Sequence, residues 1–318
     1  MLIHFIHRGD AYLPELAAYA AFLESRGHAG QVHRHLDSVP RDAQVLWWMC
    51  GRVAPAEAQR FPSAMQVHEY ASASVPPLAW IKDCAKRWRQ PRPHYRIFQN
   101  DWVRARLDPG DGVPWELRDM GIDPAGFAPM RQDAAAPTAP APPSLRPHDF
   151  VYLGEMGRLR HFLPLFDGLA RAGRSVLLVG DLPAGLRERL LRTGQVTATG
   201  RVAHAEVPAW LRQARWGLNL VPARAPYDRQ TSTKLLEYCA AGLPVVSTDY
   251  AWVRGFERRQ GARFAYVPGR ADAGRYAALL GPALETCAPV VPDVHALAWP
   301  HILASLGIWR QLGLEPGA

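Results

Sequence analysis

The sequence predicts an α/β protein made of two doubly wound domains with parallel sheets. In both halves, short apolar runs alternate with segments of helical periodicity, the pattern of parallel strands covered by helices on both faces. A stretch rich in alanine and proline, residues 132–147, separates the two halves. The length of 318 residues suits two domains of about 150 residues each.

Four apolar runs predict strands in the first half: Leu2–Ile6, Val45–Cys50, Met65–His68 and Arg96–Gln99, with a helix over Pro14–Arg26. In the second half, strands are predicted at 150–154, 175–180, 195–200, 216–222 and 244–248, with helices between them. We therefore expect an N-terminal domain over 1–131, the linker at 132–147 and a C-terminal domain over 148–292. Residues 293–318 should form a helix that crosses back to the N-terminal domain. Ligands of such domains bind beyond the carboxyl ends of the strands, so we expect the site in a cleft between the two domains.

Composition narrows the class of protein. Hydrophobic residues make up 48% of the chain and charged residues 21%, as in globular proteins. No apolar run approaches the roughly 18 residues of a membrane span, and the N-terminus lacks the pattern of a secretion signal. The four cysteines are far apart in sequence, which argues against structural zinc or disulfides and favours a reducing cytoplasm.

Several common α/β chemistries are excluded by missing motifs. Neither half has GxGxxG after its first strand, which argues against a dinucleotide-dependent dehydrogenase, and GxxxxGK[ST] and GxSxG are also absent. The pair His68-Glu69 begins like a zinc-protease helix, but Ser72 stands where HExxH needs its second histidine. The net charge of +8 suits an anionic ligand, an anionic membrane surface or nucleic acid.

The most informative segment is TSTKLLEYCAAGLPVVSTD, from Thr231 to Asp249. It predicts a polar turn, a helix that ends at Gly242 and Pro244, and a buried strand. The residues that can cap this helix are Thr231, Ser232 and Thr233. The free N–H groups and the dipole of such a helix N-terminus favour a phosphate.

Two charged side chains of this helix suit a nucleoside diphosphate. Lys234 adds a full positive charge at the helix start. Glu237 lies at i+3 on the same helix face, where its carboxylate can accept hydrogen bonds from both ribose hydroxyls. The ordinary alternative is a solvated helical ion pair worth a few tenths of a kcal/mol.

This segment resembles the donor-binding motif of GT-B glycosyltransferases, in particular retaining enzymes of glycosyltransferase family 4, in the variant P-x-K-x-x-E-Y-x-A-x-G-x-P-V-V. The matching positions here are Ser232, Lys234, Glu237, Tyr238, Ala240, Gly242, Pro244, Val245 and Val246. The resemblance implies a GT-B fold, in which two Rossmann-like domains face a cleft. It also implies transfer of a sugar, with hexose the expected class, from a nucleotide donor such as a UDP- or GDP-sugar.

The resemblance extends to other candidate residues of the donor site. Arg201 and Val202 follow a predicted strand, as in the family's turn that faces the nucleobase. Arg158 and Arg160 follow the strand FVYLG, where the family holds the diphosphate. Ser232 and Thr233 add polar groups at the helix start. Most of the family has a second glutamate eight residues before the ribose glutamate, but here that position is Arg229, which leaves the donor sugar and the retaining mechanism open.

In the N-terminal half, two residues are candidate catalytic groups. His68 ends a predicted strand and resembles the family's cleft histidine, which positions the donor sugar and the leaving group. Asp10 follows the first strand, where the family often has a turn near the acceptor and the donor phosphates. No metal-binding DxD is present, so we expect neither a metal nor another cofactor. Each residue has an ordinary alternative, as a buried histidine, a turn aspartate or a solvated arginine.

The segment from Trp80 to Arg106 combines basic and aromatic residues. This combination suits an anionic membrane interface or a lipid-linked acceptor, or single-stranded nucleic acid; a solvated helix face with aromatic core residues would look the same. We expect a glycan or lipid-linked acceptor, a cytoplasmic location that includes the inner face of the membrane, and no nucleic acid. The alternatives are an inverting transferase, which would need a carboxylate base such as Asp10, a nucleotide-sugar epimerase, and a non-catalytic nucleotide-sugar-binding subunit.

Overall fold

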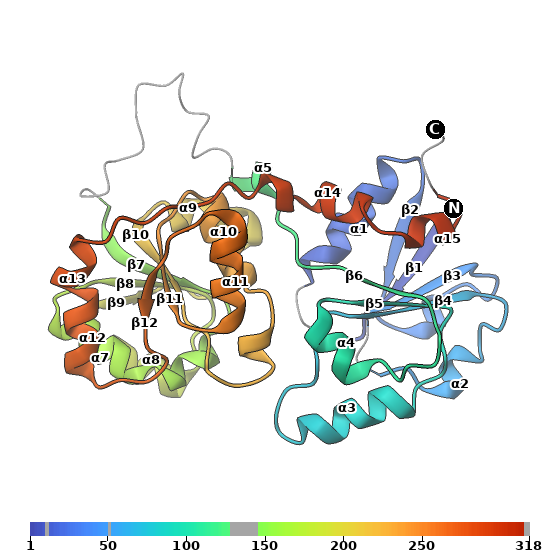
Figure 1. The fold of residues 1–318 in the computed structure, drawn as a ribbon, viewed down its shortest axis with the longest axis horizontal. Helices are drawn as coiled ribbons and strands as arrows, with labels where there is room; N and C mark the ends of the chain where they lie inside the picture. Colours follow the sequence, from blue (N-terminus) through green and yellow to red (C-terminus); the bar gives the residue numbers. More distant parts are fainter. Residues whose placement is uncertain (10–12, 50–51, 128–145, 315–318) are drawn as a thin grey trace. The chain divides into compact units, whose positions relative to one another are not determined.

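A computed structural model of the chain describes residues 1–9, 13–49, 52–127 and 146–314 (Figure 1). The chain divides into two compact units, the first with Met1–Gly121 and the segment from Leu297 onward, the second with Ile122–Ala296. Each unit is built on one six-stranded parallel sheet, so the predicted α/β fold with two doubly wound sheets is confirmed. Of the segment 132–147, only Arg146 and Pro147 lie within the described residues. No helix in the described part of the chain is both long and apolar enough to cross a membrane.

The first unit has strand order β2-β1-β3-β4-β5-β6. Its strands are β1 (Leu2–Ile6), β2 (Ala29–His33), β3 (Val45–Met49), β4 (Met65–Tyr70), β5 (Tyr95–Phe98) and β6 (Trp115–Leu117). The connecting elements are α1 (Pro14–Glu24), η1 (Leu36–Ser38), α2 (Pro55–Ala58), α3 (Ala79–Trp88) and α4 (Asp101–Leu107). The strand order reverses between β1 and β3. The switch point of this sheet therefore lies at the carboxyl ends of these two strands, which is where doubly wound folds bind ligands.

Strand β4 is longer than its predicted range, which ended at His68. Its pairing with β5 continues through Glu69, opposite Ile97, and Tyr70, opposite Phe98. The ring of Tyr70 stacks on that of Phe98 with centroids 5.2 Å apart. Because the aromatic pair prolongs the ladder, His68 lies inside the strand rather than at its end.

The prediction of a single helix over residues 293–318 is wrong. The chain forms η7 (His295–Leu297), then α14 (Trp299–Ala304) and α15 (Ile308–Gln311), and these two short helices belong to the first unit. Glu116 lies in β6. Its carboxylate accepts the N–H of Gly307 at 2.7 Å and that of Ile308 at 3.1 Å. A continuous helix would use these donors internally, so the contact with Glu116 separates α14 from α15.

The second unit has strand order β12-β11-β10-β7-β8-β9. Its strands are β7 (His148–Leu153), β8 (Val176–Val179), β9 (Val196–Ala198), β10 (Ala214–Asn219), β11 (Val245–Thr248) and β12 (Ala265–Val267). Its helical elements are α5 (Pro124–Phe127), η4 (Met156–His161), α7 (Leu163–Arg171), α8 (Ala184–Leu191), η5 (His204–Glu206), α9 (Val207–Leu211), η6 (Tyr227–Arg229), α10 (Thr233–Ala240), α11 (Ala251–Gln260), α12 (Ala273–Leu280) and α13 (Pro282–Glu285). The switch point lies between β7 and β10, and α10 follows the loop after β10 (Figure 1).

Candidate functional site

Helix α10 is fastened at the point where β7 and β10 separate. The two strands are paired as far as Gly217 and Val151. Beyond that point the Tyr238 hydroxyl accepts the Leu153 N–H at 2.9 Å and lies 3.3 Å from the Leu218 carbonyl, to which it can donate. A Cβ at position 217 would lie 2.6 Å from the Tyr238 ring, so only glycine fits there. Tyr238, in the second turn of α10, thus holds the helix, and with it the first turn, at the carboxyl edge of the sheet.

Lys234, in that first turn, is a buried cation. Its side chain is 8% exposed, its Nζ donates to the Tyr152 hydroxyl at 3.0 Å, and it lies 4.2 Å from the Tyr152 ring centroid. Within the described residues it makes no ion pair with a carboxylate. Burial, reinforced by the nearby Arg158, lowers the pKa of Lys234 to about 7, although Glu237 and Glu155 oppose the shift. A buried charge without a direct counterion is unfavourable, so this geometry is suited to an incoming anion.

Further basic side chains gather at the same edge. The Arg158 guanidinium lies 4.6 Å from the ring centroid of Tyr227 and its Nε is 3.5 Å from a Glu155 oxygen. The pKa of His161 is lowered by burial and by the cations Arg160, Arg224 and Arg270, which belong to the segments after β7, β10 and β12. Both predicted arginines, Arg158 and Arg160, are thus part of a basic surface around the switch point.

Ser232 occupies the N-cap position of α10, but the predicted side-chain cap is absent. Its hydroxyl donates instead to Asn219 Oδ1 at 2.7 Å. The Asn219 amide nitrogen in turn donates to Ser247 Oγ at 2.9 Å. The buried amide at the end of β10 competes for the serine hydroxyl, so Ser232 does not cap the N–H groups of the first turn, which begins at the exposed Thr233.

Glu237 lies one turn further along α10 and is hydrogen-bonded to a histidine that no sequence motif singles out. One Glu237 oxygen is 2.9 Å from His204 Nε2, and the glutamate side chain is 13% exposed. This hydrogen bond is the main reason that the pKa of His204 is raised. His204 belongs to η5, two residues after Val202, so the loop with Arg201 and Val202 is attached to α10 through the histidine and the glutamate.

Arg229 lies in η6, on the loop between β10 and α10. Its Nε is 3.7 Å from an Asp228 oxygen, and its side chain is 51% exposed. The neighbouring Tyr227 is the residue whose ring lies under Arg158. The position that differs from the family motif is therefore occupied by an exposed arginine on the loop that precedes the Lys234 helix.

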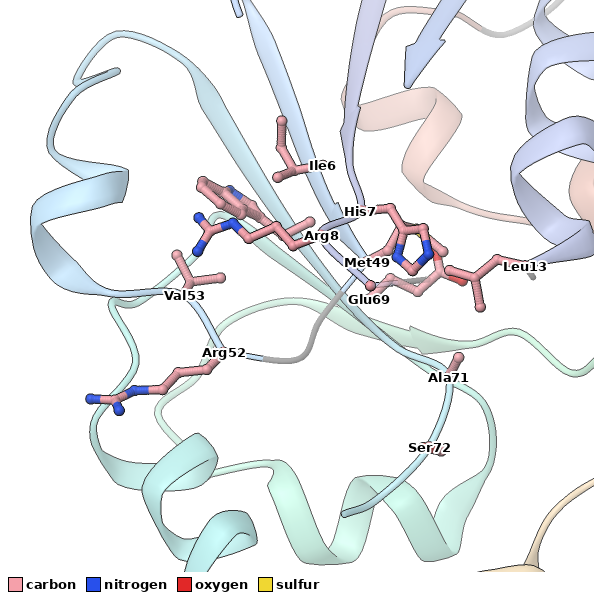
Figure 2. Close-up of a pocket in the computed structure, with 12 residues that line it drawn as sticks. Ile6, His7, Arg8, Leu13, Met49, Arg52, Val53, Glu69, Ala71 and Ser72 are labelled. Atoms are coloured by element: carbon pink, nitrogen blue, oxygen red, sulfur yellow. The ribbon is translucent and has the colours of Figure 1, made fainter. Parts of the chain in front are cut away.

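The first unit has its own pocket at its switch point. A pocket of about 300 Å³ is lined by residues from the carboxyl ends of β1, β3 and β4 and the segments after them, as Figure 2 shows. His7 and Arg8 come from the end of β1, Met49 from β3, and Ser72 from the segment after β4. Asp10, the predicted catalytic carboxylate, lies outside the described residues.

His68 is not among the residues that line this pocket. It is 1% exposed, and its Nδ1 lies 3.3 Å from the Tyr70 hydroxyl. Its Nε2 has no hydrogen-bond partner among the described residues. Burial, together with the cation Arg96, lowers the pKa of His68 to about 3, so the ring is neutral at physiological pH.

Glu69 and Arg118 form a buried ion pair that was not predicted. The Arg118 Nε donates to Glu69 Oε1 at 2.6 Å, while the Tyr19 hydroxyl and the Trp47 indole donate to Glu69 Oε2 at 3.0 and 2.7 Å. A second carboxylate, Glu15, lies 3.5 Å from the Arg118 guanidinium. Burial disfavours the charged form of Arg118, but the two carboxylates outweigh burial and raise its pKa.

The residues described by the structure contain no group of three or more His, Cys, Asp or Glu side chains placed to hold a metal ion. The absence of a metal from the reaction remains a prediction.

Comparisons with known proteins agree with this architecture. Residues 147–278 match the family model described as glycosyl transferases group 1, and this range contains Arg158, Lys234 and Glu237. No curated protein sequence matches the chain. Because the matched range is less than half of the chain, we assign the fold from structural similarity over the whole chain.

Those similarities extend over the whole chain. It resembles AviGT4, a glycosyltransferase involved in avilamycin A biosynthesis, at 15% identity and a TM-score of 0.61, covering 98% of this chain and 96% of that one. It resembles HepE of Anabaena, determined with UDP and glucose, at 12% identity and a TM-score of 0.64, covering 98% and 99%. It also resembles a sucrose-phosphate synthase from Thermosynechococcus elongatus, at 14% identity and a TM-score of 0.61, covering 98% and 99%. The fold is the GT-B fold of glycosyltransferases.

Proposed function

We propose that this protein is a glycosyltransferase that transfers a hexose from a nucleoside diphosphate donor to a glycan or lipid-linked acceptor, with retention at the anomeric carbon. The observation that carries this proposal is Lys234, a buried cation at the switch point that has no carboxylate ion pair among the described residues. Its place in the range that matches group 1 glycosyl transferases supports the same assignment.

The donor is held by charges of the second unit. Lys234 and the N–H groups at the start of α10 bind the diphosphate, because a helix N-terminus and a cation both favour phosphate oxygens. Arg158, with Arg160 and Arg229 as further cations, adds to the positive field. Ser232 acts through Asn219, which fixes the helix start, and Thr233 is the exposed polar residue beside it.

The nucleoside lies toward Glu237, whose carboxylate accepts the ribose hydroxyls while His204 fixes its position. Arg201 and Val202, on the loop attached through His204, contact the base. UDP is the first nucleotide to test, because HepE of Anabaena was determined with UDP and with UDP-glucose.

Catalysis then consists of alignment and electrostatics. Holding donor and acceptor in line removes much of the entropic barrier, and cations placed at the departing diphosphate stabilise the charge that develops there. His68 and Asp10 remain proposed contributors in the first unit, and no metal is required by the proposal. Retention can be tested by NMR of the anomeric centre of the product.

Calorimetric titration of UDP into the wild-type protein and two variants tests the donor site. Lys234→Met removes the charge with little change of volume, and Glu237→Gln weakens the acceptor for the ribose hydroxyls. Each should reduce affinity about ten- to a hundredfold, corresponding to about 1.5–3 kcal/mol.

Glu188→Gln, at a side chain 78% exposed on α8, is the matched control for the glutamate and should bind UDP like wild type. Unchanged affinity in both site variants would contradict the donor-site assignment.

A further inference from the structure

Helix α3 of the first unit exposes apolar side chains to solvent and buries a charged one, the reverse of an ordinary surface helix. Its one fully buried side chain is an aspartate, Asp83. Trp80 and Trp88 are each 64% exposed, and Leu78, just before the helix, is 61% exposed. A surface helix normally turns its apolar stripe to the core and its charges to water. Here the apolar side chains remain largely exposed to solvent, and Trp88 contacts the guanidinium of Arg87, 5.0 Å from its ring centroid.

The aspartate explains how the helix stays attached. Asp83 accepts the backbone N–H of Ser74 at 2.8 Å and the Arg106 Nε at 3.0 Å, which ties α3 to the loop before it and to α4. The helix packs along α4 (Figure 1). Because polar contacts supply this attachment, the apolar residues are not needed for it.

The exposed apolar residues share one face. Successive residues of a helix are turned by about 100°, so Trp80, Ile81, Cys84 and Trp88 occupy a single sector of about 100°. Ile81 is 43% exposed and Cys84 is also exposed. Leu78, Trp80, Ile81 and Trp88 are called the α3 apolar face below.

Cations border this face on both sides. In helical projection Arg87 lies on one side of it and Lys82 on the other. Over residues 75–92 the cations are Lys82, Lys86, Arg87, Arg89 and Arg92, against the single acid Asp83. Because Asp83 is already paired with Arg106, the surface around the α3 apolar face carries a net positive charge.

We propose that the α3 apolar face, with its flanking cations, is a docking surface for a bilayer that contains anionic lipids. Tryptophan prefers the boundary between lipid headgroups and hydrocarbon, and basic residues beside it attract anionic headgroups. The helix of 10 residues is too short to span a bilayer and suits a position parallel to its surface.

A groove beside α3 extends this surface toward the pocket of the first unit. It has a volume of about 590 Å³ and is lined by Lys82, Lys86, Arg52 and Ser72 among others. Arg52 and Ser72 also line the pocket at the switch point. The groove thus joins the flanking cations Lys82 and Lys86 to that pocket, which suits an acceptor with an anionic headgroup held at the membrane surface; this extension alone rests on the proposed function.

Sedimentation with vesicles tests the docking surface without any enzymatic assay. Wild type should sediment with phosphatidylcholine vesicles that contain about 30% phosphatidylglycerol at low ionic strength, and much less with pure phosphatidylcholine or at about 0.5 M salt. Lys82→Glu/Arg89→Glu should weaken partitioning at least about 25-fold, since each basic residue contributes roughly fivefold. Trp80→Ser/Trp88→Ser should weaken it at least about tenfold.

Matched controls separate this face from general charge and hydrophobicity. Arg41→Glu/Arg192→Glu carries the same net charge as the first variant and changes exposed arginines elsewhere. Trp115→Ser removes another exposed tryptophan, on β6. Both should partition like wild type. If wild type stays in the supernatant at low salt, or if the controls lose binding as strongly as the α3 variants, the proposal is overturned, and a protein or nucleic acid would be the occupant to test.

A fluorophore on Cys84 tests insertion directly. Cys84 lies in the same sector of the helix as Trp80, Ile81 and Trp88. After Cys50→Ser and Cys287→Ser, an environment-sensitive NBD label on Cys84 should show a blue shift of its emission when anionic vesicles are added. Binding without any blue shift would mean that the face stays in water and would contradict the proposal. UDP titration of the same samples keeps this result distinct from the donor-site assignment, because vesicle docking does not depend on UDP affinity.

Discussion

Arg118 in the first unit and Lys234 in the second are both buried near the carboxyl edge of their sheet, but the two cations have opposite surroundings. Arg118 in the first unit is bound by Glu69 and lies beside Glu15. Lys234 in the second unit contacts the hydroxyl and ring of Tyr152 and has no carboxylate ion pair within the described residues. The pKa of Arg118 is raised, whereas that of Lys234 is lowered to about 7. A buried cation with its own counterions stabilises the fold, whereas one without them is suited to an external anion.

Arg118→Met should destabilise the first unit strongly. Removing one partner of a buried ion pair leaves Glu69 and Glu15 without compensation, so the free energy of unfolding should fall by about 3–5 kcal/mol. Urea unfolding followed by circular dichroism measures this change.

The affinity of the Arg118→Met protein for UDP should remain that of wild type wherever the protein is still folded. A loss of stability below about 1 kcal/mol would mean that Arg118 is not a structural cation.

Lys234→Met should have the opposite effect on stability. Without ligand, burial disfavours the charged form of Lys234 and lowers its pKa to about 7. The variant removes this unfavourable group, so its free energy of unfolding should be unchanged or higher by about 1–4 kcal/mol. Urea unfolding of the ligand-free protein is the measurement. A marked loss of stability would show that Lys234 supports the fold in the manner of Arg118, and the contrast between the units would disappear.

His68→Ala changes a buried, neutral residue of the first unit, whereas α10 and the proposed donor site belong to the second unit. UDP affinity should stay within about twofold of wild type, while turnover of a UDP-sugar should fall by about tenfold or more, about 1.4 kcal/mol. Steady-state kinetics and calorimetry on the same preparation separate the two quantities. An equal loss of affinity and turnover would argue against this role.

His204→Ala should lower the free energy of unfolding only slightly, by an amount that depends on pH. Because the hydrogen bond to Glu237 raises the pKa of His204, its contribution to stability is complete below about pH 6.5, the ordinary pKa, and disappears as pH rises through the raised value. His204 is 43% exposed, so screening limits this contribution to about 0.2–1 kcal/mol. Thermal unfolding should show a larger difference from wild type at low pH than at high pH; a difference independent of pH would contradict the assignment.

The central strands could be predicted from the sequence, but most of the edge strands could not. Strand β1 has its predicted bounds, and the central strands β7, β10 and β11 lie within a few residues of theirs. The edge strands β2, β6 and β12 were not predicted. They contain few buried residues, because an edge strand pairs on one side only. The apolar run that reveals a central strand is therefore weak or absent in them.

The same limit applies to the site. Lys234 and Glu237 could be selected because one helix brings them together in a local pattern. Tyr152 and His204 could not, since they reach α10 only through the packing of β7 and of the loop after β9. The predicted cap at Ser232 failed for a related reason: its hydroxyl donates to Asn219, 13 residues away in sequence.

Proton uptake on UDP binding tests whether Lys234 is the cation that binds the donor diphosphate. It can be measured by calorimetry at about pH 8 in two buffers of different ionisation enthalpy. With a pKa of about 7, free Lys234 is mostly neutral at that pH, and a bound diphosphate favours its charged form. Wild type should therefore take up close to one proton per UDP bound, and Lys234→Met should take up none. Binding of UDP by wild type without proton uptake would show that Lys234 is already charged and compensated, and would contradict its assignment as the cation that awaits the donor diphosphate.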